Sequence, residues 1–206
     1  MRRMSQDELG DIVTTRLRRN AMTIDADTLW RITFFSSGLP FYTHSLGKHA
    51  ALRAIIGRRR KVTENDVYSA MQDCMADVDQ SVKESYVKAT ERIYRKYNIF
   101  AQVLAACALA EPDTLGRYSA TSVEDPLTSI MGKPHKTESF VFHLNQLCKP
   151  ERGRILRKVE QRRSFRFQFI DPLMQPYIVM KSLENKIISN DVMDNFRIDR
   201  QRRLSI

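Results

Sequence analysis

Phe165-Arg166-Phe167-Gln168-Phe169 alternates aromatic and polar side chains with a period of two. Because successive side chains of a strand point to opposite faces, this stretch predicts a strand whose phenylalanines pack inward, with Arg166 and Gln168 on the other face. The run from Ile155 to Glu160 also alternates, and Gln161-Arg162-Arg163-Ser164 separates the two runs. Together they predict a β-hairpin with a basic tip.

Helical patterns flank this hairpin on both sides. They cover the alanine-rich stretch 99–110, the segment 121–130 ending at Gly132, the segment 137–147 ending before Pro150, and the segment 173–183 after Asp171-Pro172. The two short helices joined by residues 132–136 have the size of a helix-turn-helix. The order helix, helix, helix, hairpin predicts a winged helix, with strand confined to residues 155–169 and a short segment near Ser119.

The first half of the chain reads as a small helical bundle. Ser5, Asp25, Pro40 and Thr63 stand where helix starts are expected, and each is followed by apolar residues at helical spacing. The fold class expected is therefore mainly α. We predict a helical bundle at residues 1–80, an exposed linker helix of mixed charge at 81–97, the winged helix at 98–183 and a polar, frayed tail at 184–206.

The composition restricts the classes of partner. Lys and Arg total 34 against 24 Asp and Glu, a formal charge of +10, which favours nucleic acid or an acidic protein surface. Cys74, Cys107 and Cys148 lie far apart within apolar patterns, as expected for buried thiols in a reducing compartment. The apolar stretch 99–110 is too short to cross a bilayer. We expect a cytoplasmic protein that is not bound to a membrane.

Two parts of the chain, considered together, resemble a known family. Ser37-Gly38-Leu39-Pro40-Phe41-Tyr42 is similar to the Gly-x-Pro turn in the helical lid of AAA+ and STAND-type P-loop ATPases. Residues 97–183 resemble the winged helix that follows the lid in origin-binding initiators, through the strings 142–153 and 169–177. The resemblance implies a lid followed by a DNA-binding winged helix, and it covers nearly the whole chain.

The chain departs from this family in two ways. It has no G-x-x-x-x-G-K-[ST] loop; the nearest string, Gly47-Lys48-His49, lies inside a predicted helix, so the amides that cradle phosphate are missing. Many such lids also carry an arginine early in their third helix, whereas here the first is Arg53. We therefore expect a non-catalytic C-terminal part or relic of an ATPase, with no cofactor of its own. ATP and magnesium would belong to the parent protein.

The resemblance implies nucleotide contacts at Gly38, Pro40 and Tyr42, with His44 nearby, if an ATPase domain of the same parent protein docks on the lid. The alternative is a helix stop followed by a helix start, since glycine and proline punctuate many helix pairs. For the isolated chain we favour this alternative.

The hairpin is the candidate contact with DNA phosphates. Residues 149–166 contain eight cations against Glu151 and Glu160: Lys149, Arg152, Arg154, Arg157, Lys158, Arg162, Arg163 and Arg166. Phosphate contacts require such cations on a protruding element. A solvated hairpin on a winged helix that docks proteins explains them equally well, because a basic patch is only an electrostatic footprint.

The second helix of the helix-turn-helix is the candidate for a DNA groove. Its predicted outward positions are Thr137, Ser139, His143, Asn145 and Gln146. Asparagine and glutamine can bind adenine edges, but few cations accompany them, and for His143 a buried or merely exposed role is favoured over base contact.

Nothing in the sequence points to catalysis. The four histidines do not join the cysteines in metal-ligand spacing, so no metal site is predicted and we do not expect an enzyme. The main hypothesis is a DNA-binding module coupled to an absent ATPase domain. The rivals are a protein-docking winged helix and one that holds a signalling or defence ATPase closed. Homo-oligomerisation stays open.

Overall fold

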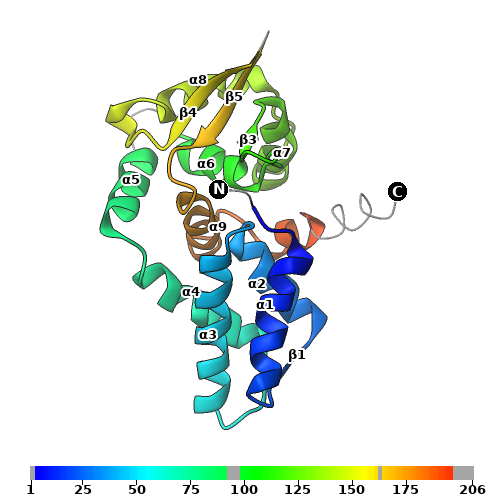
Figure 1. The fold of residues 1–206 in the computed structure, drawn as a ribbon. Helices are drawn as coiled ribbons and strands as arrows, with labels where there is room; N and C mark the ends of the chain where they lie inside the picture. The colour runs from blue at the N-terminus through cyan, green and yellow to red at the C-terminus, as the bar shows by residue number, and fades with distance from the viewer. Residues whose placement is uncertain (1–2, 92–97, 162–163, 197–206) are drawn as a thin grey trace. The chain divides into compact units, whose positions relative to one another are not determined.

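The computed structural model describes residues 3–91, 98–161 and 164–196, and it is mainly helical, as the sequence predicts. The chain divides into two compact units, Met1–Asp79 and Gln80–Ile206, which we call unit 1 and unit 2. Figure 1 shows helices α1 to α4 in the first and the mixed helix and sheet structure in the second. Each unit has its own core and is described by itself.

Unit 1 is a bundle whose helices begin at the caps that the sequence predicts. Ser5 and Glu8 form a reciprocal capping box at the start of α1, and Asp25 accepts a hydrogen bond from the backbone of Thr28 at 2.8 Å at the start of α2. Ile32 and Leu46 are fully buried in the core. The helices are α1 (Gln6–Arg19), α2 (Ala26–Ser36), α3 (Pro40–Ile56) and α4 (Glu64–Ala76).

A small parallel pairing in unit 1 was not predicted. Strand β1 (Thr23–Ile24) pairs with β2 (Lys61–Val62), with Thr23 opposite Lys61 and Ile24 opposite Val62. The prediction that strand is confined to the hairpin region was wrong here. Two residues are too few to establish a period-two pattern, and the pairing depends on the two interhelical connections meeting in space.

The helices of unit 2 lie close to their predicted positions. The alanine-rich helix α6 is buried along almost its whole length, which fits its central place in this unit. Contacts join α6 to α5, α7, α8 and α9. The elements are α5 (Gln80–Thr90), α6 (Phe100–Leu109), the 3₁₀ turn η1 (Thr121–Val123), α7 (Glu124–Met131), α8 (Thr137–Leu147), the 3₁₀ turn η2 (Pro150–Arg152) and α9 (Met174–Glu184).

A three-stranded antiparallel sheet completes unit 2. Strand β5 (Ser164–Phe169) lies between β3 (Arg117–Tyr118) and β4 (Leu156–Gln161), as Figure 1 shows. Its inner face buries Tyr118, Leu156, Phe167 and Phe169. Phe165 belongs to the same alternation but is 53% exposed, at the beginning of β5 and opposite Glu160. The prediction that it packs inward was wrong.

Two segments expected to be exposed are packed. Helix α5 buries Val82 and Tyr86, and the Tyr86 ring meets Tyr177 of α9 edge-on at 5.6 Å between centroids. It is thus a packed element of unit 2 that ends at Thr90, and the rest of the predicted linker, 92–97, lies outside the described residues. In the predicted polar tail, Ile188 and Met193 are buried. Mixed charge did not reveal these few apolar contacts.

Candidate nucleic-acid interface

The register of the hairpin sorts its cations between the two faces of the sheet. Arg157 lies opposite Gln168, and Val159 lies opposite Arg166. Directly opposed residues share a face, so both arginines lie on the face away from Phe167 and Phe169. Arg157 donates to Gln168 Oε1 from Nε at 3.1 Å and from Nη2 at 2.8 Å, which fixes this guanidinium on the outer face.

Lys158 behaves differently from the arginines of the hairpin. It lies opposite Phe167 and therefore on the aromatic face. Its Nζ is 4.6 Å from the ring centroid of Phe165 and 5.9 Å from that of Phe167. The ammonium group thus covers the exposed edge of the aromatic row and stays accessible to an anion.

The exposed cations of the hairpin carry no carboxylate partner within the ranges that the structure describes. We define the basic wing as Arg154, Arg157, Lys158 and Arg166, together with Arg162 and Arg163, which the sequence places between β4 and β5. Arg154, Arg157 and Lys158 are exposed and Arg166 is half-buried, and none of the four forms an ion pair there. Arg162 and Arg163 lie outside the described residues.

Arg152 is part of the basic run but not of the basic wing. It is 5% exposed, its guanidinium carbon lies 4.0 Å from the centroid of the Phe100 ring, and its Nη1 donates to the Glu91 carbonyl at 2.8 Å. This cation joins the η2 turn to α6 and to the chain beyond α5. No sequence pattern indicates this burial, because charge alone does not separate a buried arginine from a solvated one.

The start of α8 is held by α7 rather than left open. Glu124 accepts hydrogen bonds from the backbone nitrogen and Oγ1 of Thr137 at 2.9 and 2.7 Å, and Lys136 Nζ lies 3.1 Å from the same carboxylate. The Thr137 contacts, followed by that of Lys136, lower the pKa of Glu124. Ser139 is exposed, but its hydroxyl donates to the Lys136 carbonyl at 2.7 Å. Thr137 is therefore a positioning residue of the helix-turn-helix.

His143 packs inward, so its place among the predicted outward positions of α8 was wrong, although a buried or merely exposed role was already favoured over base contact on the sequence alone. Its ring meets Phe100 edge-on at 4.7 Å between centroids, and burial, followed by the charge of Arg152, lowers its pKa. The periodicity could have shown this, since His143 follows Phe140 by three residues and precedes Leu147 by four. The outer face instead presents Glu138 and Phe142, with Asn145 half-buried and Lys149 exposed beyond the helix end.

The predicted nucleotide contacts form a packed turn. Gly38 has a φ of +82°, its carbonyl accepts from the Met4 nitrogen at 3.0 Å, and a Cβ at this position would lie 2.8 Å from that of Arg3. Pro40 occupies the first turn of α3. Tyr42 is 1% exposed, so it is closed to a nucleotide and that prediction was wrong: Tyr42 shares the buried face with Leu46, four residues on.

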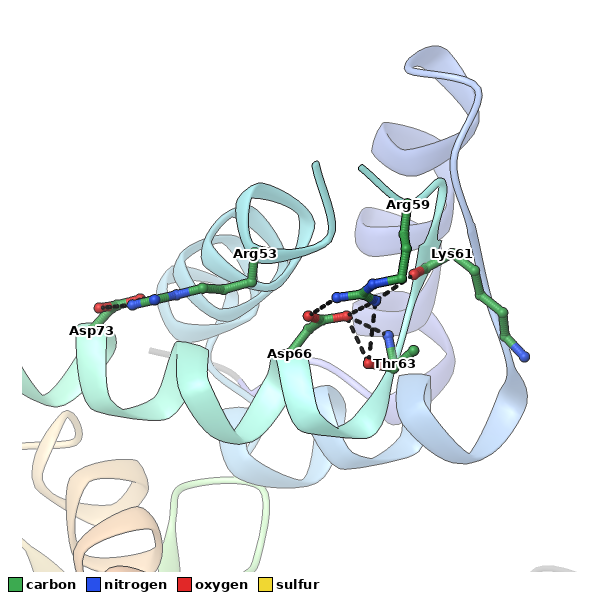
Figure 2. Close-up of polar contacts among 6 residues, drawn as sticks. All are labelled: Arg53, Arg59, Lys61, Thr63, Asp66 and Asp73. Carbon is green, nitrogen blue, oxygen red and sulfur yellow. Dashed lines mark hydrogen bonds and ion pairs between the residues drawn. The ribbon is translucent and has the colours of Figure 1, made fainter. Parts of the chain in front are cut away.

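The basic run 58–61 in unit 1 is largely occupied in holding the bundle together. Figure 2 shows the Arg59 guanidinium against the Asp66 carboxylate, with two N–O distances of 2.7 Å. Asp66 also accepts from the backbone nitrogen of Thr63 at 2.8 Å, and Lys61 Nζ lies 3.2 Å from Asp25. These partners are carboxylates of unit 1 itself. The run is therefore a weaker candidate for phosphate contact than the basic wing.

Comparisons with known proteins assign no family to this arrangement. A scan against models of protein families finds no match, and a search of curated protein sequences finds no significant similarity. Over the described ranges, no group of three or more His, Cys, Asp or Glu side chains is placed to hold a metal ion. Over the same ranges, every helix is too short or too polar to cross a bilayer.

Proposed function

We propose that unit 2 is a winged helix that binds duplex DNA through the basic wing. The order α6, β3, α7, α8, β4, β5 and the strand order β3-β5-β4 support this proposal. In such a domain α7 and α8 form the helix-turn-helix, and the β4–β5 hairpin is the wing.

The observation that carries the proposal is the contrast between two basic segments. In the run 58–61, Arg59 and Lys61 are paired with Asp66 and Asp25, and Arg60 donates to the Asn20 carbonyl at 3.1 Å, so that Arg58 alone has no partner among the described residues. In the basic wing, Arg154 and Arg166 have no carboxylate partner within the described residues. Cations that are not neutralised within the protein are those whose phosphate contacts release counterions and so contribute to affinity.

The mechanism proposed is positioning without strong sequence preference. The basic wing contacts the phosphate backbone while α8 lies over a groove. Phosphate contacts fix orientation and carry no sequence information. The outer face of α8 offers Asn145 as a base-contacting group but also an acid, Glu138, so backbone contacts dominate.

We further propose that the chain is the non-catalytic C-terminal part of an AAA+ or STAND-like ATPase. Unit 1 would then be the lid, and the nucleotide, with magnesium, would be held by an ATPase domain of the same parent protein. With Tyr42 buried, the lid could offer a docked nucleotide only the half-buried turn at Gly38 and Pro40. Coupling between nucleotide state and the winged helix rests on analogy with that class.

A second candidate function, protein docking or autoinhibition by the same winged helix, has its own observation. Phe142 on the outer face of α8 is 56% exposed, and Phe165 in strand β5 of the hairpin is 53% exposed. Exposed aromatic side chains are typical of protein interfaces and unusual on a surface that faces phosphate.

Paired arginine substitutions test the DNA proposal. Replacing Arg162 and Arg163, which connect β4 to β5 in the sequence, with alanine should weaken binding to unrelated duplexes to a similar extent. The slope of log affinity against log salt should flatten by roughly 0.9 for each phosphate that the variant no longer neutralises. Fluorescence anisotropy at several salt concentrations measures both quantities.

Arg18→Ala with Arg19→Ala is the matched control, because these two consecutive arginines are exposed in unit 1 and their removal changes the net charge equally. Wild-type slope and affinity are expected for it. If both double variants bind equally weakly, the attraction is general and the basic wing is not the site. If the wild type binds no duplex even at low salt, protein docking becomes the better proposal.

A further inference from the structure

Unit 1 carries an open groove between α1 and α3, and none of the residues that line it belongs to the DNA proposal. The hollow has a volume of about 270 Å³ and is lined by residues of α1, α3 and the connection after α1. It exists because the facing side of α3 has small residues at Thr43, Gly47 and Ala51, spaced four apart. Even a Cβ added at Gly47 would only touch Val13, at 3.5 Å.

The groove has a mainly apolar lining, and its outer wall is exposed to solvent. Ile12 and Leu17 line it from α1, and Leu52 and Ile55 line it from α3. Leu52 is 44% exposed and Ile55 50% exposed, and the adjoining Ile56 is 77% exposed. Three large aliphatic side chains exposed together at one end of a helix form a patch of the kind that marks an interaction site, unlike single exposed residues.

Cations border the apolar floor on both sides. Arg16 of α1 and Lys48 of α3 line the groove, and no aspartate or glutamate does. Neither cation forms an ion pair within the described ranges. His44 also lines the groove; its Nδ1 is buried without a hydrogen-bond partner among the described residues, and burial followed by the charge of Arg16 lowers its pKa.

The shape of the groove indicates the size of its occupant. The lining residues of α3 run from Thr43 to Ile55, which at 1.5 Å per residue is roughly 18 Å. That length corresponds to about three turns of a helix and exceeds what a compact metabolite needs. A helix lying in an apolar groove inserts side chains at i, i+3 or i+4, and i+7.

We propose that this groove binds an amphipathic helix of a partner protein, with apolar residues seated between α1 and α3 and acidic residues facing Arg16 and Lys48. The apolar floor supplies affinity and the bordering cations select an acidic partner and its orientation. The site is independent of the basic wing, so either proposal can fail alone.

Designed peptides test this site in the full-length chain. The probe is a fluorescein-labelled helical peptide of about 16 residues, with Leu at successive i, i+4, i+7 positions and Glu on both flanks. A second peptide replaces every Glu with Lys. Anisotropy should show saturable binding of the Glu-flanked peptide and weaker binding of the Lys-flanked one. Failure of the Glu-flanked peptide to bind at about 1 mM would overturn the proposal.

Two substitutions locate the binding. Ala51→Phe fills the groove and should weaken binding of the Glu-flanked peptide by about tenfold or more. Arg16→Glu should weaken binding of the Glu-flanked peptide by roughly five- to tenfold and strengthen binding of the Lys-flanked peptide. Arg18→Glu is the matched control: it lies in the same last turn of α1, makes the same charge change, does not line the groove, and should have an effect below about twofold.

Three further outcomes would refute the proposal. Unchanged affinity in Ala51→Phe would place the peptide elsewhere. Equal effects of Arg16→Glu and Arg18→Glu would mean unspecific attraction to a basic protein. Light scattering without peptide tests whether a second copy of this chain is the occupant. If the wild type is a dimer and Ala51→Phe makes it a monomer, a second copy fills the groove and the proposed partner helix does not. Circular dichroism and a melting curve for each variant distinguish a defect in binding from a defect in folding.

Discussion

Asp66 combines two local functions that the sequence shows only in part. The string 63–66 predicts a capped helix start, and Asp66 does accept hydrogen bonds from the nitrogen and Oγ1 of Thr63 at 2.8 and 2.7 Å. Its salt bridge to Arg59, seven residues earlier, was not predicted. The carboxylate is nearly buried, at 5% residue exposure, so its partners must replace the water that it gives up.

Replacing Asp66 with Asn should lower the free energy of unfolding by about 1–2 kcal/mol at pH 7, because the cap is weakened and Arg59 loses its counter-charge. The Arg59 hydrogen bonds, followed by those from Thr63, lower the pKa of Asp66 from 3.8 to about 2. A lowered folded-state pKa stabilises the protein above the unfolded pKa, and this contribution disappears as pH falls through the folded pKa.

Urea unfolding between pH 7 and pH 2 measures this effect. The stability difference between the wild type and Asp66→Asn should be full above about pH 4 and shrink toward zero near pH 2. Asp73→Asn is the control, since Asp73 lies on the same helix and pairs with Arg53 at 2.7 Å but is more exposed; its cost should stay below about 1 kcal/mol. If the stability difference between the wild type and Asp66→Asn stays constant with pH, the lowered pKa of Asp66 is not the source of its stabilising effect.

At the scale of elements, local signals were sufficient for most helices and for the hairpin. Ser5 predicts the start of α1, Gly132 the end of α7, and Pro150 the end of α8, because caps, glycine and proline act within one turn of the chain. The alternation of aromatic and polar residues at 165–169 predicts β5, because it too is a pattern between near neighbours in the sequence. These features need no knowledge of distant residues.

What the sequence did not show depends on residues far apart in the chain. The β1–β2 pairing joins residues 23–24 to 61–62. Arg152 is buried by Phe100, which lies 52 positions earlier, a separation that no local pattern encodes. Of the predicted DNA-contacting residues, His143 and Thr137 are held by residues distant in the sequence, Phe100 and Glu124. Arg154 and Lys149 are exposed, and Asn145 is half-buried. Site prediction failed mainly where a polar residue faces inward.

The glycines that end α7 and η2 provide a paired test of packing between elements. Gly132 and Gly153 have φ values of +66° and +71°, so alanine is strained at both. A Cβ at Gly132 would meet nothing within 4 Å, whereas one at Gly153 would lie 2.6 Å from the Ser85 carbonyl oxygen of α5. Gly132→Ala should therefore lower the free energy of unfolding by about 1 kcal/mol, and Gly153→Ala should lower it by at least about twice as much.

Thermal and urea unfolding of the two variants measure the difference directly. The backbone strain is nearly the same in both, so any excess for Gly153→Ala reports the close approach of the η2 turn to α5. Equal losses of stability would mean that α5 moves away at little cost. In that case α5 would be the loosely attached linker that its mixed charge predicted.

At the scale of the whole molecule, the two proposed interfaces belong to different units. The groove lies within unit 1 and the basic wing within unit 2, and each unit has a buried core of its own. Two cores of this kind allow two unfolding transitions instead of one.

A single tryptophan makes this separation measurable. Trp30 is the only tryptophan of the chain, and its ring stacks on Phe34 of α2 at 4.8 Å between centroids. Its fluorescence therefore reports unit 1, while far-UV circular dichroism reports the helices of both units. In urea, we expect the two signals to give transitions that do not coincide, because they weight two separately cooperative units differently.

The substitutions above assign each transition to its unit. Asp66→Asn should lower the urea midpoint of the Trp30 fluorescence and of the dichroism transition that belongs to unit 1. Gly153→Ala should lower only the midpoint of the dichroism transition that belongs to unit 2 and leave the fluorescence midpoint unchanged. Each substitution acts on contacts within one core, so its free-energy cost stays in that core unless the units unfold together. If both variants move both signals equally, the units form one cooperative structure, and a ligand bound at the groove would then stabilise the wing as well.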